Sequence, residues 1–341
     1  MKRIYLDHAA TTYLDPRVQE AMRPFWQKEF GNASSLYLEG RLAKQAIEDA
    51  RKTCAKILNC LPEEIIFTGS GTESDNLAVI GTAYGIGKPL HAITTKIEHH
   101  AVLHSFNFLE SIGWKVDYLS VDKYGLVTPE QVAKAIRPET ALISIMFANN
   151  EVGTVEPIKE ISSKLPGLAS ARPRAGKAQS SKLGKNKIYF HTDACQAAGF
   201  FNLDTQKLGV DLLTINGSKI YGPKGTGLLY IKKGTPLKPV IQGGGQEKGI
   251  RPGTENVAGT VGLSKALELA VEEREGEAKR LTILRDILIR GVLATIPGAI
   301  LNGHPTLRLP NNANFCFPGV EGESLLLLLD KEGICGSTGS A

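Results

Sequence analysis

The stretch Glu64-Ile65-Ile66-Phe67-Thr68-Gly69-Ser70-Gly71-Thr72-Glu73-Ser74 joins an apolar, β-branched run to a turn of small residues. This pattern predicts a buried strand over residues 64–68 and a helix over residues 73–84. In such a turn, the backbone N–H groups of the helix N-terminus can bind a phosphate. The turn lacks both the lysine of a P-loop and the G-x-G-x-x-G spacing, so a plain helix N-cap is an equally good interpretation.

The alternation of strand and helix patterns continues along the chain. Further strands are predicted at residues 91–95, 115–119, 140–147, 188–191 and 212–215, with helices at 100–110, 129–136 and 157–164. Strands that alternate with helices form a largely parallel sheet with helices on both faces, so the fold class is α/β. The loops that follow the strands are expected at one edge of this sheet, where open sheets bind ligands.

A length of 341 residues predicts about two domains. We expect an N-terminal arm over residues 1–33, a large domain over 34–259, and a smaller α+β domain over 260–341. The smaller domain holds a helix over 260–293, either continuous or interrupted near Gly276, then a strand over 313–317 and a helix over 322–331.

Composition excludes several classes of protein. The chain is 42% hydrophobic and 22% charged, which is typical of a globular protein and not of a disordered one. The leucine run over 325–329 is too short to cross a bilayer, and no apolar stretch follows the N-terminus as in a secretory signal. We therefore expect a cytoplasmic protein with no membrane partner.

The net charge of +5 is unevenly distributed. Residues 161–187 hold seven basic residues, no acid and no aromatic residue, so the remainder carries a net −2. We interpret residues 165–187 as a basic surface insertion and not as a nucleic-acid site, because no aromatic side chain is present to stack on bases. Binding of tRNA by this insertion remains an alternative.

The five cysteines and seven histidines show no metal-ligand spacing, and we expect no metal. The cysteines, which we interpret as small buried residues, are Cys54, Cys60, Cys195, Cys316 and Cys335.

Polar residues with complementary chemistry follow several predicted strands. They are His99 after the strand at 91–95, Asp193 and Gln196 after the strand at 188–191, and Asn216, Ser218 and Lys219 after the strand at 212–215. A lone lysine is usually a solvated charge. A lysine beside an acid, a histidine and a phosphate-binding turn is what pyridoxal phosphate requires, since its aldehyde, ring nitrogen, ring face and phosphate each need a partner.

Seven motifs in order resemble those of cysteine desulfurases of the NifS/IscS type, in the class-V aminotransferase family. They are residues 5–12 (YLDHAATT), 70–76 (SGTESDN), 98–103 (EHHAVL), 149–153 (NNEVG), Asp193 with Gln196, 219–225 (KIYGPKG) and 251–256 (RPGTEN). The resemblance covers nearly the whole chain apart from the basic insertion. It implies the fold-type I architecture of pyridoxal-phosphate enzymes.

The resemblance also implies a role for each matching residue. Lys219 carries the cofactor as an imine and moves the Cα proton, and Asp193 keeps the pyridine nitrogen protonated. Gln196 bonds the phenolic oxygen, and His99 stacks on the ring and assists proton transfer. The residues implied in the remaining cofactor contacts are Gly71, Thr72 and Asn150, and Thr254 from the neighbouring subunit of a homodimer. Asn216 and Ser218 stand where the family commonly has serine and histidine, which leaves the detailed phosphate contacts open.

The implied reaction converts L-cysteine to L-alanine and passes the sulfur, as a persulfide, to an acceptor protein for iron–sulfur clusters or thiolated tRNA. In the family, the segment resembling residues 337–341 leads into the nucleophilic cysteine, so we expect this chain to be a fragment that binds cofactor with little or no desulfurase turnover. The alternatives are another fold-type I lyase or aminotransferase, and a non-catalytic homologue that acts as a scaffold.

Overall fold

The computed structural model describes residues 3–166 and 187–338. The basic insertion predicted over residues 165–187 lies, apart from its ends, outside the described residues, as does the end of the segment 337–341. Among the described residues, no helix combines the length and apolar character needed to cross a bilayer.

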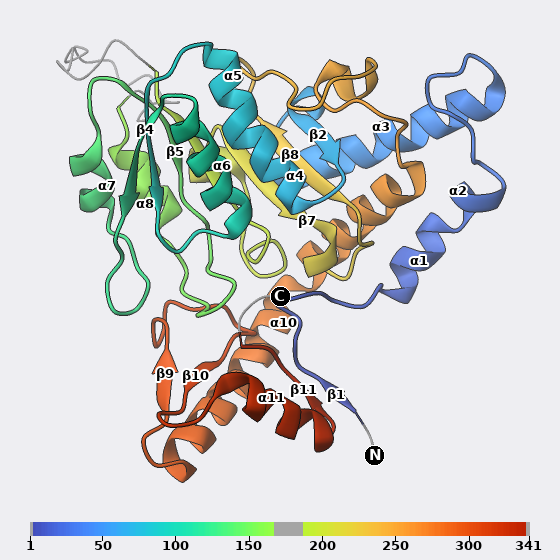
Figure 1. Ribbon diagram of the computed structural model, residues 1–341. Helices are drawn as coiled ribbons and strands as arrows, with labels where there is room; N and C mark the ends of the chain where they lie inside the picture. The colour runs from blue at the N-terminus through green and yellow to red at the C-terminus, as the bar shows by residue number, and fades with distance from the viewer. Residues whose placement is uncertain (1–2, 167–186, 339–341) are drawn as a thin grey trace.

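A seven-stranded sheet forms the centre of the molecule (Figure 1). Its strands are β2 (Ile65–Thr68), β3 (His91–Thr95), β4 (Lys115–Leu119), β5 (Thr140–Ser144), β6 (Tyr189–Asp193), β7 (Leu212–Asn216) and β8 (Gly227–Ile231). Their spatial order is β2-β8-β7-β6-β5-β3-β4. Strand β8 is antiparallel to both neighbours and every other adjacent pair is parallel, so six strands point the same way. The α/β prediction is confirmed, although it omitted β8.

Helices cover both faces of this sheet. They are α3 (Leu38–Leu58), α4 (Gly71–Asn76), α5 (Thr82–Ile86), α6 (His100–Ser111), α7 (Pro129–Ala135), α8 (Ile158–Lys164) and α9 (Thr205–Leu208). A π-helical turn, Leu77–Gly81, makes α4 and α5 one continuous helical run. Thr128 begins α7 by accepting a hydrogen bond from the Gln131 N–H at 3.2 Å, with Pro129 in the first turn.

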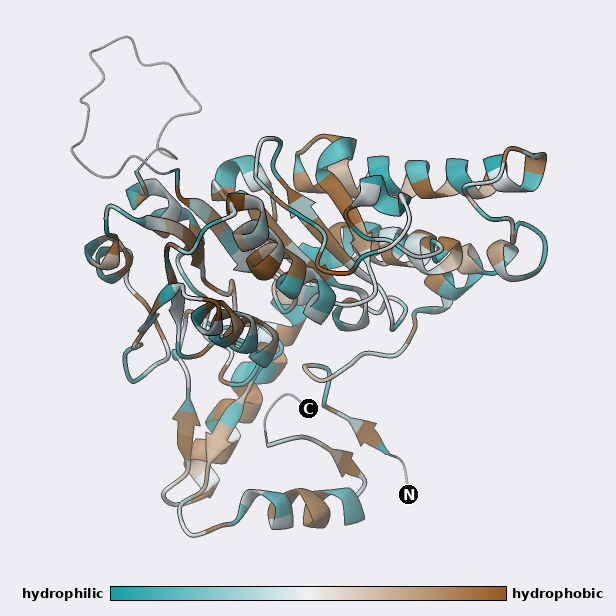
Figure 2. Ribbon diagram, turned by 45° about the horizontal axis from the view of Figure 1, so that its top comes forward, coloured by the Kyte–Doolittle hydropathy of each residue, from teal (hydrophilic) through white to brown (hydrophobic). Residues whose placement is uncertain are grey.

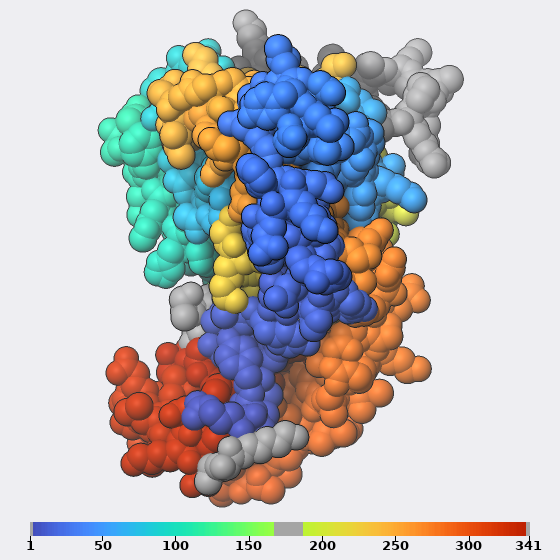
Figure 3. All heavy atoms as spheres, turned by 90° about the vertical axis from the view of Figure 1, so that its right-hand side faces the viewer, coloured from blue at the N-terminus to red at the C-terminus, as the bar shows by residue number. Residues whose placement is uncertain are grey.

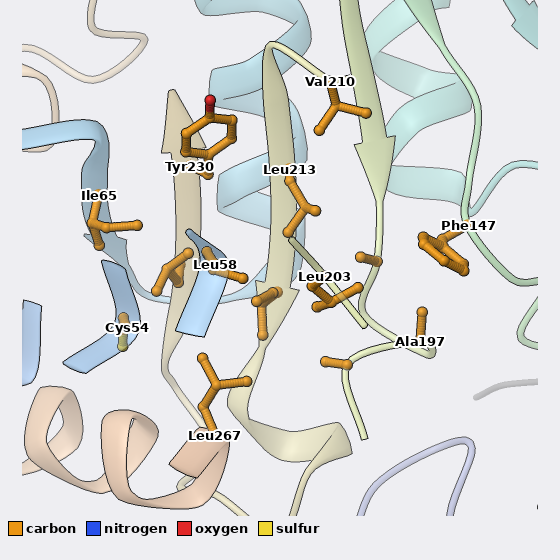
Figure 4. Close-up of a cluster of buried hydrophobic side chains, with 14 of the residues drawn as sticks. Cys54, Leu58, Ile65, Phe147, Ala197, Leu203, Val210, Leu213, Tyr230 and Leu267 are labelled. Atoms are coloured by element: carbon orange, nitrogen blue, oxygen red, sulfur yellow. The ribbon is translucent and has the colours of Figure 1, made fainter. Parts of the chain in front are cut away.

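Alternate residues of each strand enter different hydrophobic cores. Leu213 and Tyr230 face the larger core with α3 and α10, whereas Leu212 and Leu229 lie in a smaller core against the π-helical turn. Figure 4 shows the larger core, and Figure 2 shows apolar residues concentrated in the central strands. This period of two is expected of strands buried on both faces.

The C-terminal part begins with the 39-residue helix α10 (Val257–Thr295), which Asn256 caps by accepting the Gly259 N–H at 2.9 Å. After it come β9 (Ile300–Asn302), β10 (Asn314–Cys316), α11 (Gly322–Lys331) and β11 (Ile334–Cys335). The helix is continuous through Gly276, so the interrupted alternative is wrong. It runs from the central sheet to the small antiparallel pair β9–β10 (Figure 1).

The N-terminal segment contacts both parts of the molecule. Its first strand β1 (Ile4–Tyr5) pairs in parallel with β11, and α1 (Pro16–Met22) packs on α10, followed by the short helix α2 (Pro24–Gln27). Asp15 caps α1 through its side chain. Figure 3 shows this segment along the surface beside the C-terminal part.

Candidate active site

The polar residues predicted to act together follow strands that end at one edge of the sheet. Because β8 alone is reversed, the carboxyl ends of β2, β7, β6, β5 and β3 all meet at that edge. The turn over residues 69–72, the segment 216–219, the segment 193–196 and the segment 98–99 therefore converge there.

The turn after β2 is built around glycine. A Cβ on Gly71 would lie 2.9 Å from Cys195 Sγ and 3.2 Å from Asn216 Cβ, so no larger residue fits without displacement. Ser70 Oγ accepts a hydrogen bond from the Glu73 N–H at 3.1 Å and caps α4. The turn therefore lies against Cys195, which follows β6, and against Asn216, which ends β7.

Lys219 ends a single 3-10 turn, Gly217–Lys219, directly after β7. The Asn216 side chain fixes this turn, because its Oδ1 accepts hydrogen bonds from the N–H and the hydroxyl of Ser218, both at 3.1 Å. The Lys219 amine donates to the carbonyl oxygens of Ala9 and Ala10, at 2.6 and 2.5 Å. The N-terminal segment therefore closes over the lysine.

Burial lowers the pKa of Lys219, against the opposing charges of Cys195, Asp193 and Asp7. Desolvation disfavours the ammonium form, so the neutral amine is favoured more than in a solvated lysine. The neutral amine is the form that attacks an aldehyde.

Asp193 ends β6 and Gln196 follows it, and the charge of Asp193 acts on the same lysine. Asp193 is the last residue of the strand and is 7% exposed, and its Oδ1 accepts the Cys195 N–H at 2.9 Å. Gln196 Nε2 donates to the Ala9 carbonyl at 3.0 Å, the acceptor that Lys219 also uses. No lysine or arginine of the described residues forms an ion pair with Asp193, which leaves its carboxylate open to a cationic ligand group.

His99 caps the N-terminus of α6 through its ring. Its Nδ1 accepts the Ala101 N–H at 3.1 Å, so the neutral ring carries its proton on Nε2. Burial lowers the pKa of His99, and the negative charge of Asp193 opposes that shift. His99 is therefore a neutral ring near Asp193 and Lys219.

Asn150 is buried, 8% exposed, in the segment that follows β5. Its neighbour Asn149 fixes that segment, since Asn149 Oδ1 accepts the N–H groups of Glu151 and Val152 and its Nδ2 donates to the Ile97 carbonyl at 2.9 Å. This last bond links the segment to the loop that carries His99.

Two residues predicted to contact the cofactor are not buried in the site. Thr72 and Thr254 are both exposed. The loop that carries Thr254 is nevertheless tied to the glycine turn, because Arg251 Nε donates to Glu73 Oε1 at 2.8 Å and Glu73 Oε2 accepts the Gly69 N–H at 2.7 Å. Thr254 thus lies three residues from an ion pair at the turn.

Several residues at this edge escaped sequence analysis. Asp75 on α4 and His191 on β6 are buried behind Asp193, and Glu98 beside His99 is buried with its pKa raised to about 8. Asp75 lies in the motif at residues 70–76 and Glu98 in the motif at residues 98–103, so these motifs could have indicated both residues. No group of three or more potential metal ligands gathers in the described part of the chain.

The comparisons with known proteins agree with this geometry. Residues 4–169 and 177–341 match the family model of aminotransferase class-V. The cysteine desulfurase IscS of Dictyoglomus turgidum is 51% identical over 344 residues, which covers all of this chain and 82% of the relative. The solved structure of a NifS-like protein superposes with a TM-score of 0.89 at 39% identity, covering 98% of this chain and 87% of the other. That of SspA in complex with cysteine superposes with a TM-score of 0.81 at 35% identity, covering 99% and 89%.

The chain belongs to the aminotransferase class-V family, whose members depend on pyridoxal phosphate. Its curated relatives within that family are cysteine desulfurases, so the resemblance seen in the seven motifs is confirmed.

The residues present fit that cofactor. The glycine turn leaves no room for a side chain at Gly71, Asp193 offers a buried carboxylate that forms no ion pair among the described residues, and Lys219 offers an amine whose pKa is lowered. These are the partners required by a phosphate, a basic ring nitrogen and an aldehyde.

Proposed function

We propose that this chain binds pyridoxal phosphate covalently at Lys219 and acts on L-cysteine as a cysteine desulfurase. The observation that carries the proposal is the convergence of Lys219, Asp193 and Gln196 at one edge of the sheet. The Lys219 amine and the Gln196 amide both donate to the carbonyl oxygen of Ala9. The SspA structure in complex with cysteine supports cysteine as the substrate.

When bound, pyridoxal phosphate supplies a ring that accepts the electron pair left on Cα as a proton departs. Asp193 would hold the ring nitrogen through its carboxylate, and Gln196 would donate to the phenolic oxygen. Lys219 would take and return the Cα proton at Nζ, which its lowered pKa favours. His99 would lie on the ring face with its Nε2 proton available to a reacting group.

The phosphate contacts would come from the turn and the segment after β7. Gly71 and Thr72 would offer backbone N–H groups and a hydroxyl, and Asn216 would add its Nδ2 donor. Ser218 would add its hydroxyl once that group turns from Asn216 Oδ1 toward the phosphate. Asn150 would contact the bound substrate. Thr254 would reach the phosphate of a second subunit in a homodimer, which agrees with its exposure here.

A homodimer is also supported by the apolar surface of the N-terminal region. Over residues 26–42, the large apolar side chains that are at least 43% exposed are Trp26, Phe30, Leu36, Tyr37, Leu38 and Leu42. Such a surface is typical of a protein–protein interface.

The sulfur acceptor would be a protein that serves iron–sulfur cluster or thiolated tRNA synthesis. The cytoplasm is proposed as the compartment, because all five cysteines are free thiols, as in a reducing environment. Cys195, which interacts with Lys219, is not proposed as the sulfur-accepting thiolate, since burial raises its pKa well above the usual value.

Visible absorbance of the cofactor-loaded protein tests the proposal. We expect Lys219→Ala to lose the absorption band of lysine-bound cofactor. Lys224→Ala is the matched control, because Lys224 lies five residues away and donates to the Thr12 carbonyl at 3.0 Å. An unchanged band in Lys219→Ala would remove this lysine from its assigned role.

A further inference from the structure

A group of buried polar side chains lies behind Asp193, between α4 and three strands of the sheet. Asp75 comes from α4, Ser144 from β5, His191 from β6 and Thr214 from β7, and each is at most 1% exposed. The strand registers bring them together, because Ser144 pairs with His191 and Asp193 pairs with Thr214.

His191 is the centre of this group. Its Nδ1 lies 2.8 Å from Ser144 Oγ, and its Nε2 lies 3.0 Å from Thr214 Oγ1 and 3.7 Å from Asp75 Oδ1. Burial lowers the pKa of His191 to about 3, so the ring is neutral and brings no positive charge to Asp75.

Asp75 is surrounded by acids and neutral groups. The groups that interact with it are the carboxyls of Asp193 and Glu98, the thiol of Cys195 and the Thr214 hydroxyl, besides the neutral His191 ring. Its Oδ1 receives no hydrogen bond from any residue that the structure describes. Burial, followed by the charge of Asp193, raises the pKa of Asp75. An ionised carboxylate in such a place would be strongly unfavourable.

We propose that Asp75 holds a proton at neutral pH and is a positioning residue for Asp193, which then carries the only negative charge of this pair. Two buried carboxyl groups that interact strongly share one charge in preference to carrying two. We place the charge on Asp193, because its Oδ1 accepts the backbone N–H of Cys195 at 2.9 Å. The Asp75 carboxyl bonds the Thr214 hydroxyl, and its Oδ1 accepts no hydrogen bond from the residues that the structure describes.

A protonated Asp75 matters for the ring nitrogen of pyridoxal phosphate, which Asp193 is proposed to hold. This inference therefore rests on the proposed function. A protonated Asp75 adds no second negative charge beside the Asp193 carboxylate. It therefore leaves Asp193 as the one anionic group of the pair that faces the ring nitrogen.

Infrared spectroscopy of the cofactor-free protein tests the proton directly. With 13C-labelled aspartate, we expect a carbonyl band of a protonated carboxylic acid at neutral pH that shifts with the label and is missing from Asp75→Asn. Glu98→Gln is the control, because it removes a band that does not respond to the label. The absence of any label-sensitive band in the wild-type protein would overturn the proposal, even if Asp75→Asn failed to fold.

A second measurement uses the cofactor-loaded protein. We expect its visible spectrum to change at alkaline pH as Asp75 ionises, and Asp75→Asn to lack that step. Cys195 and Glu98 interact with Asp75, so their own titrations also change in Asp75→Asn. Cys195→Ala and Glu98→Gln are therefore measured beside it, and a step that belongs to Asp75 must remain in both. Identical titrations would contradict the inference. Failure of the proposed function itself would appear elsewhere, as an unchanged absorption band in Lys219→Ala.

Discussion

Lys219 and Gln196 donate hydrogen bonds to one acceptor, the carbonyl oxygen of Ala9, at 2.6 and 3.0 Å. The two side chains follow different strands, β7 and β6, and a backbone atom near the chain's N-terminus holds them together. The N-terminal segment is therefore part of the candidate site, and the bonds that anchor it should matter for stability.

Thr12 is the anchor that a single substitution tests best. Its hydroxyl donates to the Ser218 carbonyl at 3.0 Å and accepts the Tyr221 N–H at 2.8 Å, and the residue is 2% exposed. We expect Thr12→Val to lower the free energy of unfolding by about 1–3 kcal/mol, because a buried N–H loses its acceptor. Thr11→Val, which removes only a 3.5 Å contact, is the control in urea unfolding. Equal losses in the two variants would contradict this account.

The lowered pKa of Lys219 predicts how cofactor capture depends on pH. The rate of covalent capture should rise with pH, with a midpoint below the value of about 10.4 for a solvated lysine. Asp7→Asn should move the midpoint lower still, because the charge of Asp7 favours the ammonium form. Stopped-flow absorbance at a series of pH values measures both. A midpoint at or above that of free lysine would show that burial does not control this amine.

Glu98 predicts a pH-dependent stability. Burial raises its pKa from 4.5 to about 8, so between these values the folded protein keeps a proton that the unfolded chain has lost. Unfolding therefore becomes easier as pH rises through this window. Glu98→Gln should remove the dependence and gain up to about 5 kcal/mol relative to wild type by pH 8, measured by urea unfolding. The exposed Glu275→Gln should show no such trend. If the difference in unfolding free energy between Glu98→Gln and the wild-type protein stays constant from pH 5 to pH 8, this prediction is wrong.

The buried ion pair between Arg51 and Glu247 should be the most costly one to break. Arg51 Nη2 lies 2.6 Å from Glu247 Oε1, both side chains are at most 5% exposed, and Glu247 Oε2 also accepts the Phe67 N–H. We expect Arg51→Met to cost about 3–5 kcal/mol, because it leaves a buried carboxylate unpaired. Arg23→Met, which breaks an exposed pair, should cost about 1 kcal/mol or less. Similar unfolding midpoints for the two variants would contradict the expectation.

The central sheet was largely predictable because its buried strands are short apolar runs between turn residues. Strand β8 is equally apolar, but it follows the lysine loop without an intervening helix, and periodicity does not reveal strand direction. The helix α3 was omitted although Ala43, Ile47, Ala50, Cys54 and Leu58 recur every three or four residues and are all buried.

The candidate site was predictable where side chains end strands and carry chemistry, as with Asp193 and Lys219. The Ala9 carbonyl was not, because a backbone acceptor has no side-chain signature. His191 was missed for a different reason. Its neighbours Ser144 and Thr214 come from other strands, so only the strand registers reveal that they meet.

The most direct test of the central claim is to reduce the cofactor-loaded protein with borohydride and locate the modified lysine by peptide mass spectrometry. The account predicts that the pyridoxyl group is found on the peptide containing Lys219 and on that residue. A label on Lys224, or no labelled peptide from folded protein saturated with cofactor, would contradict it.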